Sequence, residues 1–137
     1  MRYMLDTNIC IYLMRHHPPE VAERFAKLEY GDVMMSSITL AELRYGVECR
    51  PESRDTAETA LLALLTDVPV MAFDSDAATS YGLVRAAVRD RKRDALDRLI
   101  AAHAISLSVT LVTNNEADFK DYPGLVIENW AENREKS

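Results

Sequence analysis

Several acidic and amide residues stand where an apolar stretch ends or a helix-forming stretch begins. They are Asp6, Glu42, Asp97, Asn115 and Asp118. In an α/β fold, such junctions meet at one edge of a parallel sheet, where these folds bind ligands. Carboxylates packed together repel one another unless a cation neutralises them, and Mg²⁺ prefers oxygen ligands. The pattern therefore predicts a divalent-metal site at this edge.

Each of these positions also has an ordinary structural explanation. Asp6 and Asn115 are both suited to cap a helix N-terminus. Thr39 and Glu42 have the spacing of a capping box, in which the Glu side chain reaches back to a backbone N–H. Asp97 at a helix start can simply be a partner of the helix dipole. Their joint occurrence at one predicted edge favours the metal site.

The elements that would position these residues alternate along the chain. Apolar stretches predict strands over 2–5, 33–36, 70–73, 110–113 and 125–127. Helical spacing predicts helices over about 7–16, 20–28, 37–48, 57–65, 77–93 and 97–107. This alternation is typical of an α/β fold with a parallel sheet covered by helices on both faces. We expect one domain over 1–132, with Trp130 packed on the core and a frayed polar tail over 133–137.

Size and composition agree with a globular domain. The chain has 137 residues, of which 48% are hydrophobic, enough for one domain with a core. No apolar run approaches the roughly 20 residues that span a bilayer, and Asp6 interrupts the short N-terminal apolar stretch, unlike a signal peptide. We therefore expect a cytoplasmic protein. Cys10 and Cys49 lie in no metal-binding spacing, and we expect both to be buried, reduced thiols.

The net charge of -6 argues against a protein that coats nucleic acid through bulk charge, but it leaves a nuclease open. One local segment is basic, with Arg85, Arg89, Arg91, Lys92 and Arg93 against Asp90. These side chains, with Arg44, are candidates for binding phosphates. The alternative is ordinary solvated charge at the end of the predicted 77–93 helix, where it would complement the helix dipole.

Four segments together resemble a known family: MLDTNICIYL, SSITLAELRYG, DRLIAAHA and LVTNNEADFKDYPGLVIENW. They are similar to blocks of VapC-type toxins, which are PIN-domain ribonucleases, and the likeness runs from about Arg2 to Trp130. It implies a PIN-like α/β/α sandwich around a parallel sheet of four to five strands. It also implies an endoribonuclease that uses Mg²⁺, or Mn²⁺ as a substitute, and cleaves structured RNA such as a transfer RNA or a ribosomal RNA loop.

The resemblance further implies a homodimer, inhibited by a VapB-type antitoxin, that reaches operator DNA only through this antitoxin. The acids that match the family's catalytic positions are Asp6, Glu42, Asp97 and Asp118. Polar residues that would order the site are Thr7, Asn8, Thr113 and Asn115. We expect Asp6 and Asp97 to bind the metal. Glu42 would ligate it directly or through water and would orient or deprotonate the attacking water.

The chain departs from the family pattern in two places. Asn115 stands where many PIN domains have Asp, which leaves Asp118 as the nearest carboxylate. The segment 91–96 is basic and lacks the Gly and Pro that relatives usually carry before the third acid. Within this segment, Asp94 is a rival to Asp97 for the metal.

The resemblance also gives a use to apolar residues on two predicted helices: Ile11, Tyr12, Met14, Leu40, Leu43 and Tyr45. Part of this set must belong to the core. Any exposed remainder would suit an amphipathic antitoxin helix lying in a groove. By contrast, His103 lies in an Ala-rich helix and is predicted to be structural.

Two other functions remain open from the sequence. A phosphoacceptor or phosphatase needs a nucleophilic Asp with a second Asp beside it and usually a Lys, and Asp6-Thr7-Asn8 lacks the second Asp. A catalytically inactive PIN-like regulatory or binding domain would have Asn115 as its lost acid. Metal-dependent RNA cleavage that requires Asp6 distinguishes the nuclease from both.

Overall fold

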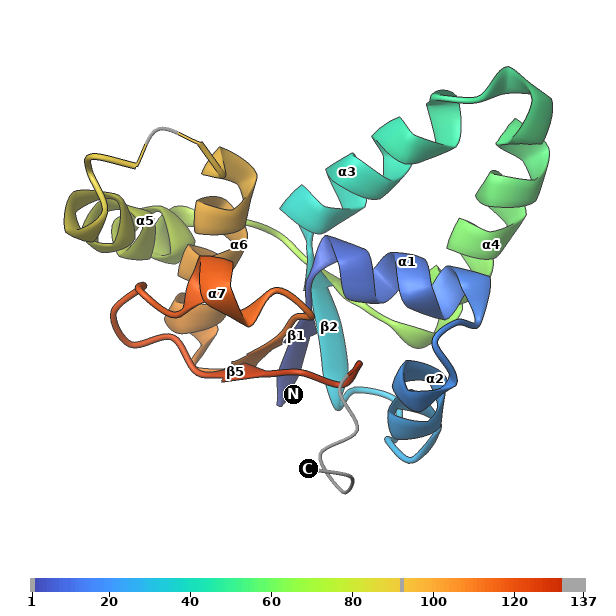
Figure 1. Ribbon diagram of the computed structural model, residues 1–137, viewed down its shortest axis with the longest axis horizontal. Coiled ribbons are helices and arrows are strands. Elements are labelled where there is room, and N and C mark those ends of the chain that lie inside the picture. Colours follow the sequence, from blue (N-terminus) through green and yellow to red (C-terminus); the bar gives the residue numbers. More distant parts are fainter. Residues whose placement is uncertain (1, 92, 132–137) are drawn as a thin grey trace.

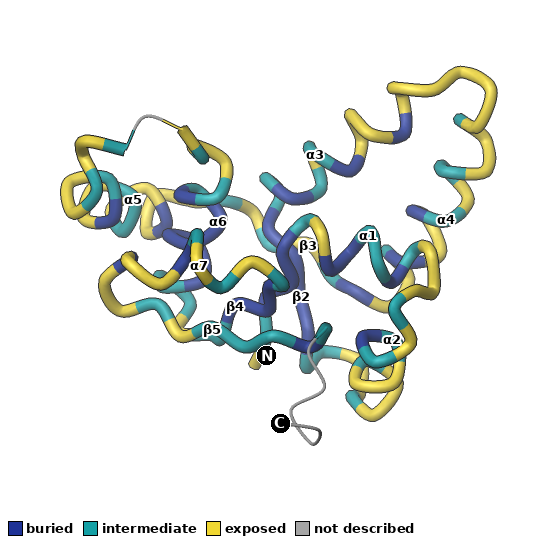
Figure 2. The backbone as a smooth tube through the Cα atoms, viewed as in Figure 1, coloured by how far each residue is buried: buried dark blue, intermediate teal, exposed yellow. Residues whose placement is uncertain are grey.

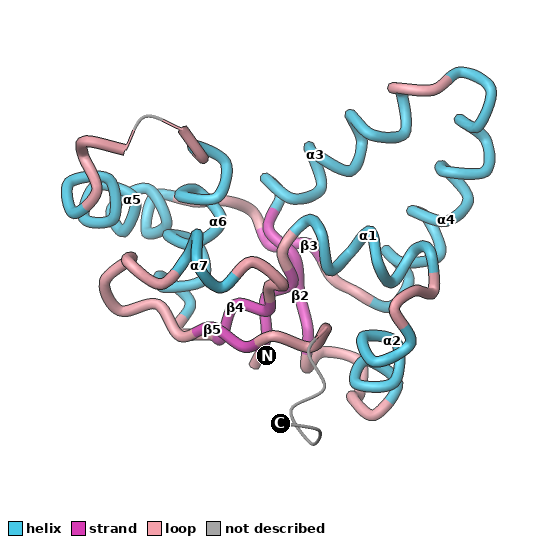
Figure 3. The backbone as a smooth tube through the Cα atoms, in the orientation of Figure 1, coloured by secondary structure: helices cyan, strands magenta, loops and turns pink. Residues whose placement is uncertain are grey.

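Five short strands form one parallel sheet in the order β3-β2-β1-β4-β5 (Figure 3). The computed structural model describes residues 2–91 and 93–131. The strands are β1 (Tyr3–Leu5), β2 (Val33–Ser36), β3 (Val70–Met71), β4 (Thr110–Val112) and β5 (Ile127–Glu128). Every pairing is parallel, as the alternation of elements predicts.

Helices cover both faces of this sheet (Figure 1). One face carries α1 (Thr7–Arg15), α2 (Pro19–Ala26), α3 (Ser37–Glu48) and α4 (Arg54–Asp67), with a 3-10 turn, η1 (Pro51–Ser53), before α4. The other carries α5 (Ser75–Ala87), α6 (Ala95–Leu107) and α7 (Glu116–Phe119). Within the described ranges, no helix combines the length and apolar character of a membrane-spanning segment.

The three central strands divide the core into two layers, because successive side chains of a strand point to opposite faces. The residues facing α1–α4 are Leu5, Met35 and Val112. The residues facing α5–α7 are Met4, Met34 and Leu111. All six are buried, and Figure 2 shows the central strands in the buried colour. The predicted α/β/α sandwich is confirmed.

Side-chain caps direct the chain from the sheet into its helices. The Asp6 carboxylate accepts a hydrogen bond from the Ile9 N–H at the start of α1. Ser36 caps α3 through the Ile38 N–H. Helices therefore begin where β1 and β2 end, and their first turns lie at the carboxyl edge of the sheet.

The segment between α5 and α6 differs from the sequence-based expectation. The helix predicted to reach Arg93 ends at Ala87, and the backbone leaves the helical region at Val88. The Arg85 guanidinium then donates to the carbonyl oxygens of Arg89 and Arg91, which replaces helical hydrogen bonds beyond Ala87. The basic residues after Arg85 therefore lie in a connecting segment, and not on the last turns of the helix.

Other expectations need smaller corrections. The strand predicted over 70–73 is only two residues long, and Val70 is exposed because β3 is an edge strand. The helix predicted over 57–65 is longer, α4 beginning at Arg54 directly after the turn η1, which Pro51 opens. Cys10 is buried as expected, and burial raises the pKa of its thiol. Cys49 is exposed, because it follows the last turn of α3 where that helix leaves the body of the protein.

Trp130 fastens the C-terminal segment to the core, as predicted. Its side chain is 1% exposed and meets the Tyr3 ring edge-on at 5.4 Å between centroids. The indole N–H donates to Glu128, and the Arg24 guanidinium lies 5.4 Å from the ring centroid. The tail predicted over 133–137 lies outside the described residues.

Replacing Trp130 by Ala should lower the free energy of unfolding by about 3–5 kcal/mol, because a large buried aromatic side chain is lost. Urea denaturation followed by far-UV circular dichroism would measure the change. Val126→Ala is the control, since Val126 is 61% exposed and should cost little. A loss below about 1 kcal/mol for Trp130→Ala would contradict the described packing.

Candidate active site

Asp6 occupies the end of the central strand β1 and is 6% exposed. One carboxylate oxygen caps α1 through Ile9, so the structural explanation for Asp6 is correct. Burial raises the pKa of Asp6 to about 6, and Glu42 adds to the rise through charge repulsion. Hydrogen bonds from Thr113 and the Ile9 N–H act in the opposite direction. Asp6 is thus both a helix cap and a member of an acidic group.

Glu42 lies in the second turn of α3 and points toward α1. Its Oε1 accepts a hydrogen bond of 2.7 Å from the Thr7 hydroxyl. The capping box proposed for Thr39 and Glu42 is wrong, because α3 begins at Ser37 and Ser36 is its cap. The Glu42 side chain is therefore fixed across the boundary between two helices, beside Asp6.

Three further carboxylates meet at the N-terminus of α6. One oxygen each from Asp94, Asp97 and Asp118 lie within 4.8 Å of one another. The pKa of Asp97 is raised to about 6, mainly by burial, and repulsion from Asp94, Asp6, Glu42 and Asp118 contributes to this rise. These carboxylates therefore interact electrostatically with one another, and we call them together the acidic site: Asp6, Glu42, Asp94, Asp97 and Asp118.

The sequence pattern predicts convergence correctly, but several positions differ from the expected strand-to-helix junctions. Only Asp6 directly follows a strand, β1, whereas Thr113 and Asn114 lie between the end of β4 and Asn115. Glu42 lies inside a helix, and Asp97 reaches the sheet edge because α6 packs along α5 and begins beside α7. Asp94 and Asp97, the two candidates in this part of the chain, both belong to the same cluster.

The polar residues predicted to order the site do contact it. Thr7 holds Glu42, and Thr113 hydrogen-bonds Asp6 while its Oγ1 accepts from the Asn115 N–H at 3.0 Å. Asn115 precedes α7 but makes no capping bond with its side chain. Its amide instead donates to Asp118 Oδ2 at 2.5 Å. The residue that departs from the family pattern thus orients the neighbouring carboxylate.

Asn114 is a site residue that the sequence pattern does not single out. Its side-chain amide donates to the Tyr12 hydroxyl at 2.7 Å, and its Oδ1 accepts a long contact of 3.5 Å from Asn8. These bonds tie α1 to the loop between β4 and α7. In the sequence, the only feature that marks Asn114 is the pair Asn114-Asn115 after an apolar stretch. Its hydrogen-bond partners, Tyr12 and Asn8, are more than 100 residues away in the chain.

Three of the predicted phosphate-binding residues, Arg44, Arg85 and Arg91, bind other groups of the protein. Arg44 forms an ion pair of 2.7 Å with Glu58, and Arg85 and Arg91 contact the protein itself. Arg89 and Arg93 are exposed, and Lys92 lies outside the described residues. His103 is buried, with its Nδ1 2.8 Å from Ser36 Oγ, which agrees with a structural role.

The acidic site suits a divalent cation by its donor set. It offers carboxylate oxygens from several elements at short mutual distances, which hard cations such as Mg²⁺ prefer. Among the described residues, its one ion pair is a 3.9 Å contact between Arg93 and Asp94. Repulsion inside the site is therefore largely uncompensated by side chains, and a bound cation would relieve it.

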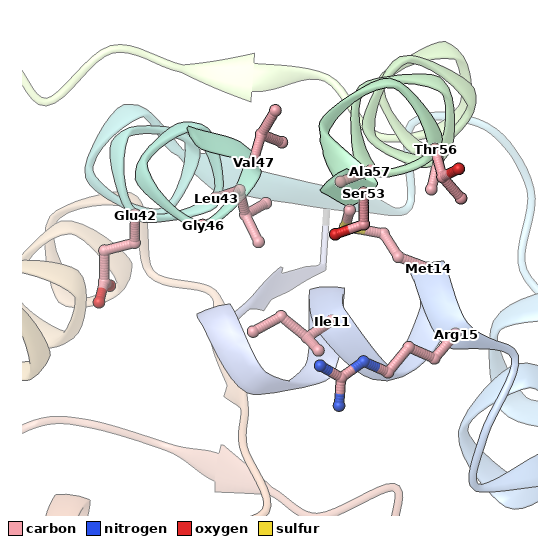
Figure 4. A pocket seen from close by; sticks show the side chains of 11 residues that line it. Ile11, Met14, Arg15, Glu42, Leu43, Gly46, Val47, Ser53, Thr56 and Ala57 are labelled. Carbon is pink, nitrogen blue, oxygen red and sulfur yellow. The ribbon is translucent and has the colours of Figure 1, made fainter. Parts of the chain in front are cut away.

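An apolar pocket of about 310 Å³ adjoins the acidic site between α1, α3 and α4 (Figure 4). Its apolar lining includes Ile11, Met14, Leu43, Val47 and Ala57, and both Glu42 and Arg15 border it. The apolar set predicted from the sequence divides as expected. Leu43 is buried and Ile11, Tyr12, Met14 and Leu40 pack partly against the core, whereas Tyr45 is 74% exposed.

A sequence model of the PIN domain matches residues 3–125, which is most of the chain. The chain belongs to the PIN domain family. This PIN domain is 36% identical over 133 residues to the tRNA(fMet)-specific endonuclease VapC of Shigella flexneri, covering 96% of this chain and 99% of that protein. It is 37% identical over 133 residues to ribonuclease VapC2 of Rickettsia felis, covering 95% and 98%.

Solved PIN-domain structures show the same architecture. The crystal structure of VapBC2 from Rickettsia felis bound to a promoter DNA fragment superposes with a TM-score of 0.87, at 36% identity over 95% of this chain and 99% of that one. DNA-bound VapBC from Salmonella typhimurium gives a TM-score of 0.86, at 35% identity over 95% and 98%. The family resemblance and the fold expected from it are confirmed.

Neutralising Asp97 should stabilise the cation-free protein. Its folded-state pKa of about 6 lies above the ordinary 3.8, so the folded protein binds more protons than the unfolded chain between those values. Stability therefore falls as the pH rises through this window. At pH 7.5, Asp97→Asn should unfold with a free energy higher by on the order of 1 kcal/mol, after allowance for solvent screening.

Urea denaturation in EDTA at pH 7.5 and pH 4 would measure this difference, which should shrink at the lower pH. The matched control is Asp76→Asn, an exposed acid in the first turn of α5, which should give no gain. A lower stability of Asp97→Asn at pH 7.5 would contradict the described repulsion.

Proposed function

We propose that this chain is the toxin of a toxin–antitoxin pair, an endoribonuclease that depends on Mg²⁺ or Mn²⁺ and acts in the cytoplasm. The observation that carries the proposal is the convergence of five carboxylates at one edge of a PIN-domain sheet, from the residues that precede α1 and α6 and from α3, α6 and α7 themselves. Full-length likeness to VapC ribonucleases supports the same reaction.

Structured RNA is the proposed substrate class. A relative at 36% identity bears the name tRNA(fMet)-specific endonuclease, so we favour a transfer RNA over a ribosomal RNA loop. The net charge of -6 means that bulk attraction cannot provide RNA affinity. Local features, including the cation and the exposed Arg89 and Arg93, would have to hold the phosphates.

Asp6, Asp97 and Glu42 would hold the cation, with Asp94 and Asp118 completing the negative site. A bound divalent cation supplies neutralisation of the phosphate and makes a water more acidic. Glu42, which accepts a hydrogen bond from Thr7, would accept the proton of the attacking water. The water oxygen forms a bond to phosphorus, and the ester bond to the leaving ribose oxygen breaks as that oxygen takes up a proton.

The alternative of an inactive PIN-like binding domain rested on Asn115 as a lost acid. Asn115 instead donates a hydrogen bond to Asp118, and Asp94 adds a carboxylate nearby. The number of acids in the site therefore favours the active enzyme. The phosphoacceptor alternative has less support, because Thr7 and Asn8 follow Asp6 where a second acid would be needed.

An antitoxin is the proposed partner, as in the VapBC complexes of similar fold. The pocket between α1, α3 and α4 would receive an apolar helix of the antitoxin, since it is apolar and open beside Glu42. A segment bound there would lie next to the acidic site and obstruct RNA. We also propose that the toxin forms a homodimer and meets operator DNA only through the antitoxin.

Total RNA incubated with purified protein and Mg²⁺ should give discrete fragments that EDTA abolishes. Glu42→Gln keeps the acceptor for Thr7 but loses the base, so cleavage should slow by about 10²- to 10⁴-fold. Asp6→Asn should also be inactive, while Asp76→Asn should cleave like the wild type. No cleavage by folded, antitoxin-free wild type with either metal would refute the proposed activity.

Filling the pocket should release the antitoxin. Gly46 lines the pocket, and a Cβ at this position would meet no other atom within 4 Å, so the backbone has room for a side chain there, and the indole of Gly46→Trp is intended to occupy the pocket. In an Asp97→Asn background that prevents toxicity, Gly46→Trp should lose the co-expressed antitoxin in affinity purification. The control Gly46→Ala should retain it and should be slightly more stable. Retention by Gly46→Trp would exclude this pocket as the binding site.

A further inference from the structure

Arginine side chains hold the segment between α5 and α6 by its carbonyl groups. Arg85 donates to the carbonyl oxygens of Arg89 and Arg91 at 3.3 and 3.4 Å. Arg98, which is 3% exposed, donates to the carbonyl oxygen of Arg93. The segment contains no Gly or Pro to fix its path. Its described part is therefore anchored by side chains from both flanking helices.

Arg91 extends these anchors from the segment to α7. Its Nη1 donates to the Asp118 carbonyl oxygen at 3.2 Å and to the Tyr122 hydroxyl at 3.3 Å. Its Nη2 lies 3.5 Å from Asp121 Oδ2, and the guanidinium sits 5.7 Å from the centroid of the Tyr122 ring. Tyr122 is 3% exposed, so this attachment point is part of the core.

The attachment joins two parts of the acidic site that repel one another. Arg91 is three positions before Asp94, and it binds the backbone of Asp118, whose carboxylate lies within 4.8 Å of Asp94 and Asp97. α7 has only four residues, too few for a helix that is stable on its own. Without a tether, repulsion would favour movement of α7 away from α6.

We propose that Arg91 is a positioning residue, which holds Asp118 beside Asp94 and Asp97 so that the site is assembled before a cation binds. Asn115 fixes the Asp118 carboxylate, and Arg91 fixes its backbone. Arg91 acts through Asp118 and does not contact substrate. This inference rests on the proposed cation-dependent nuclease.

Arginine is suited to this role in a way that lysine is not. A planar guanidinium can donate to a carbonyl and a hydroxyl, pair with a carboxylate and stack on a ring at the same time. A lysine ammonium is a compact charge on a flexible stem and would keep only part of this set. Arg91→Lys should therefore restore cation affinity only partly.

The competing role for Arg91 is a direct contact with an RNA phosphate. The two roles predict different losses. A phosphate contact would raise the KM for RNA and leave cation affinity unchanged. A positioning role would weaken cation binding in the absence of RNA, by about 10-fold on the precedent of residues that orient metal ligands.

The test is Mn²⁺ binding measured without RNA, from the electron paramagnetic resonance signal of free Mn²⁺. Arg91→Gln should bind Mn²⁺ about 10-fold more weakly than the wild type. The matched control Arg89→Gln removes the same charge from an exposed position in the same segment and should bind like the wild type. Tyr122→Phe, which removes one acceptor and keeps the ring, should show a smaller loss and provides a second variant if Arg91→Gln does not fold.

Equal Mn²⁺ affinity of folded Arg91→Gln and wild type would overturn the proposal, as would an equal loss in Arg89→Gln, which would show that the loss does not depend on the contacts of Arg91. If Arg91→Gln does not fold, wild-type affinity in Tyr122→Phe overturns it. A wild type that binds no Mn²⁺ would refute both this role and the proposed chemistry. A wild type that binds Mn²⁺ but cleaves no RNA would refute the nuclease alone, while the difference between Arg91→Gln and Arg89→Gln would still support the tether.

Discussion

The structure depends on keeping several carboxylates close together at one edge of a buried sheet. This arrangement is unfavourable for the ionised carboxylates, as Asp6 and Asp97 show: burial and neighbouring acids raise the pKa of each to about 6. Few described side chains of opposite charge reach these acids, so the fold itself must resist their repulsion. A protein of marginal stability retains such an arrangement where function requires it. The proposed role of these acids as cation ligands accounts for their arrangement.

Contacts made by other residues hold the acids close together against their repulsion. Two apolar layers on the central strands fix where β1, β2 and β4 end, and the caps Asp6 and Ser36 fix where α1 and α3 begin. Polar side chains then orient individual carboxylates by hydrogen bonds, as Thr7 does for Glu42 and Asn115 for Asp118. Rigid elements thus carry the acids, and the shorter α7 carries one whose position depends on hydrogen bonds from its neighbours.

The fold and part of the site could be predicted from the sequence, because the relevant signals are local. The apolar run of β2 and the Asp after β1 follow from neighbouring residues alone. The end of α5 could not be predicted, since it depends on Arg85 binding carbonyl groups beyond the helix. The sequence also left a capping box as an explanation for Glu42, because the residue that actually binds its side chain, Thr7, is 35 residues away. The proximity of Asp94 to both Asp97 and Asp118 could not be predicted either, because it depends on the packing of α6 against α7.

The central claim is that these acids form one cation site, in which burial and repulsion together keep Asp6 and Asp97 partly protonated near pH 6. The most direct measurement is the number of protons released when Mg²⁺ is added to weakly buffered protein at pH 6. Wild type should release protons in a saturable manner, because Asp6 and Asp97 are partly protonated at that pH and a cation displaces their protons. Asp97→Asn should release fewer. No release by the wild type, or the same release by both proteins, would contradict the account.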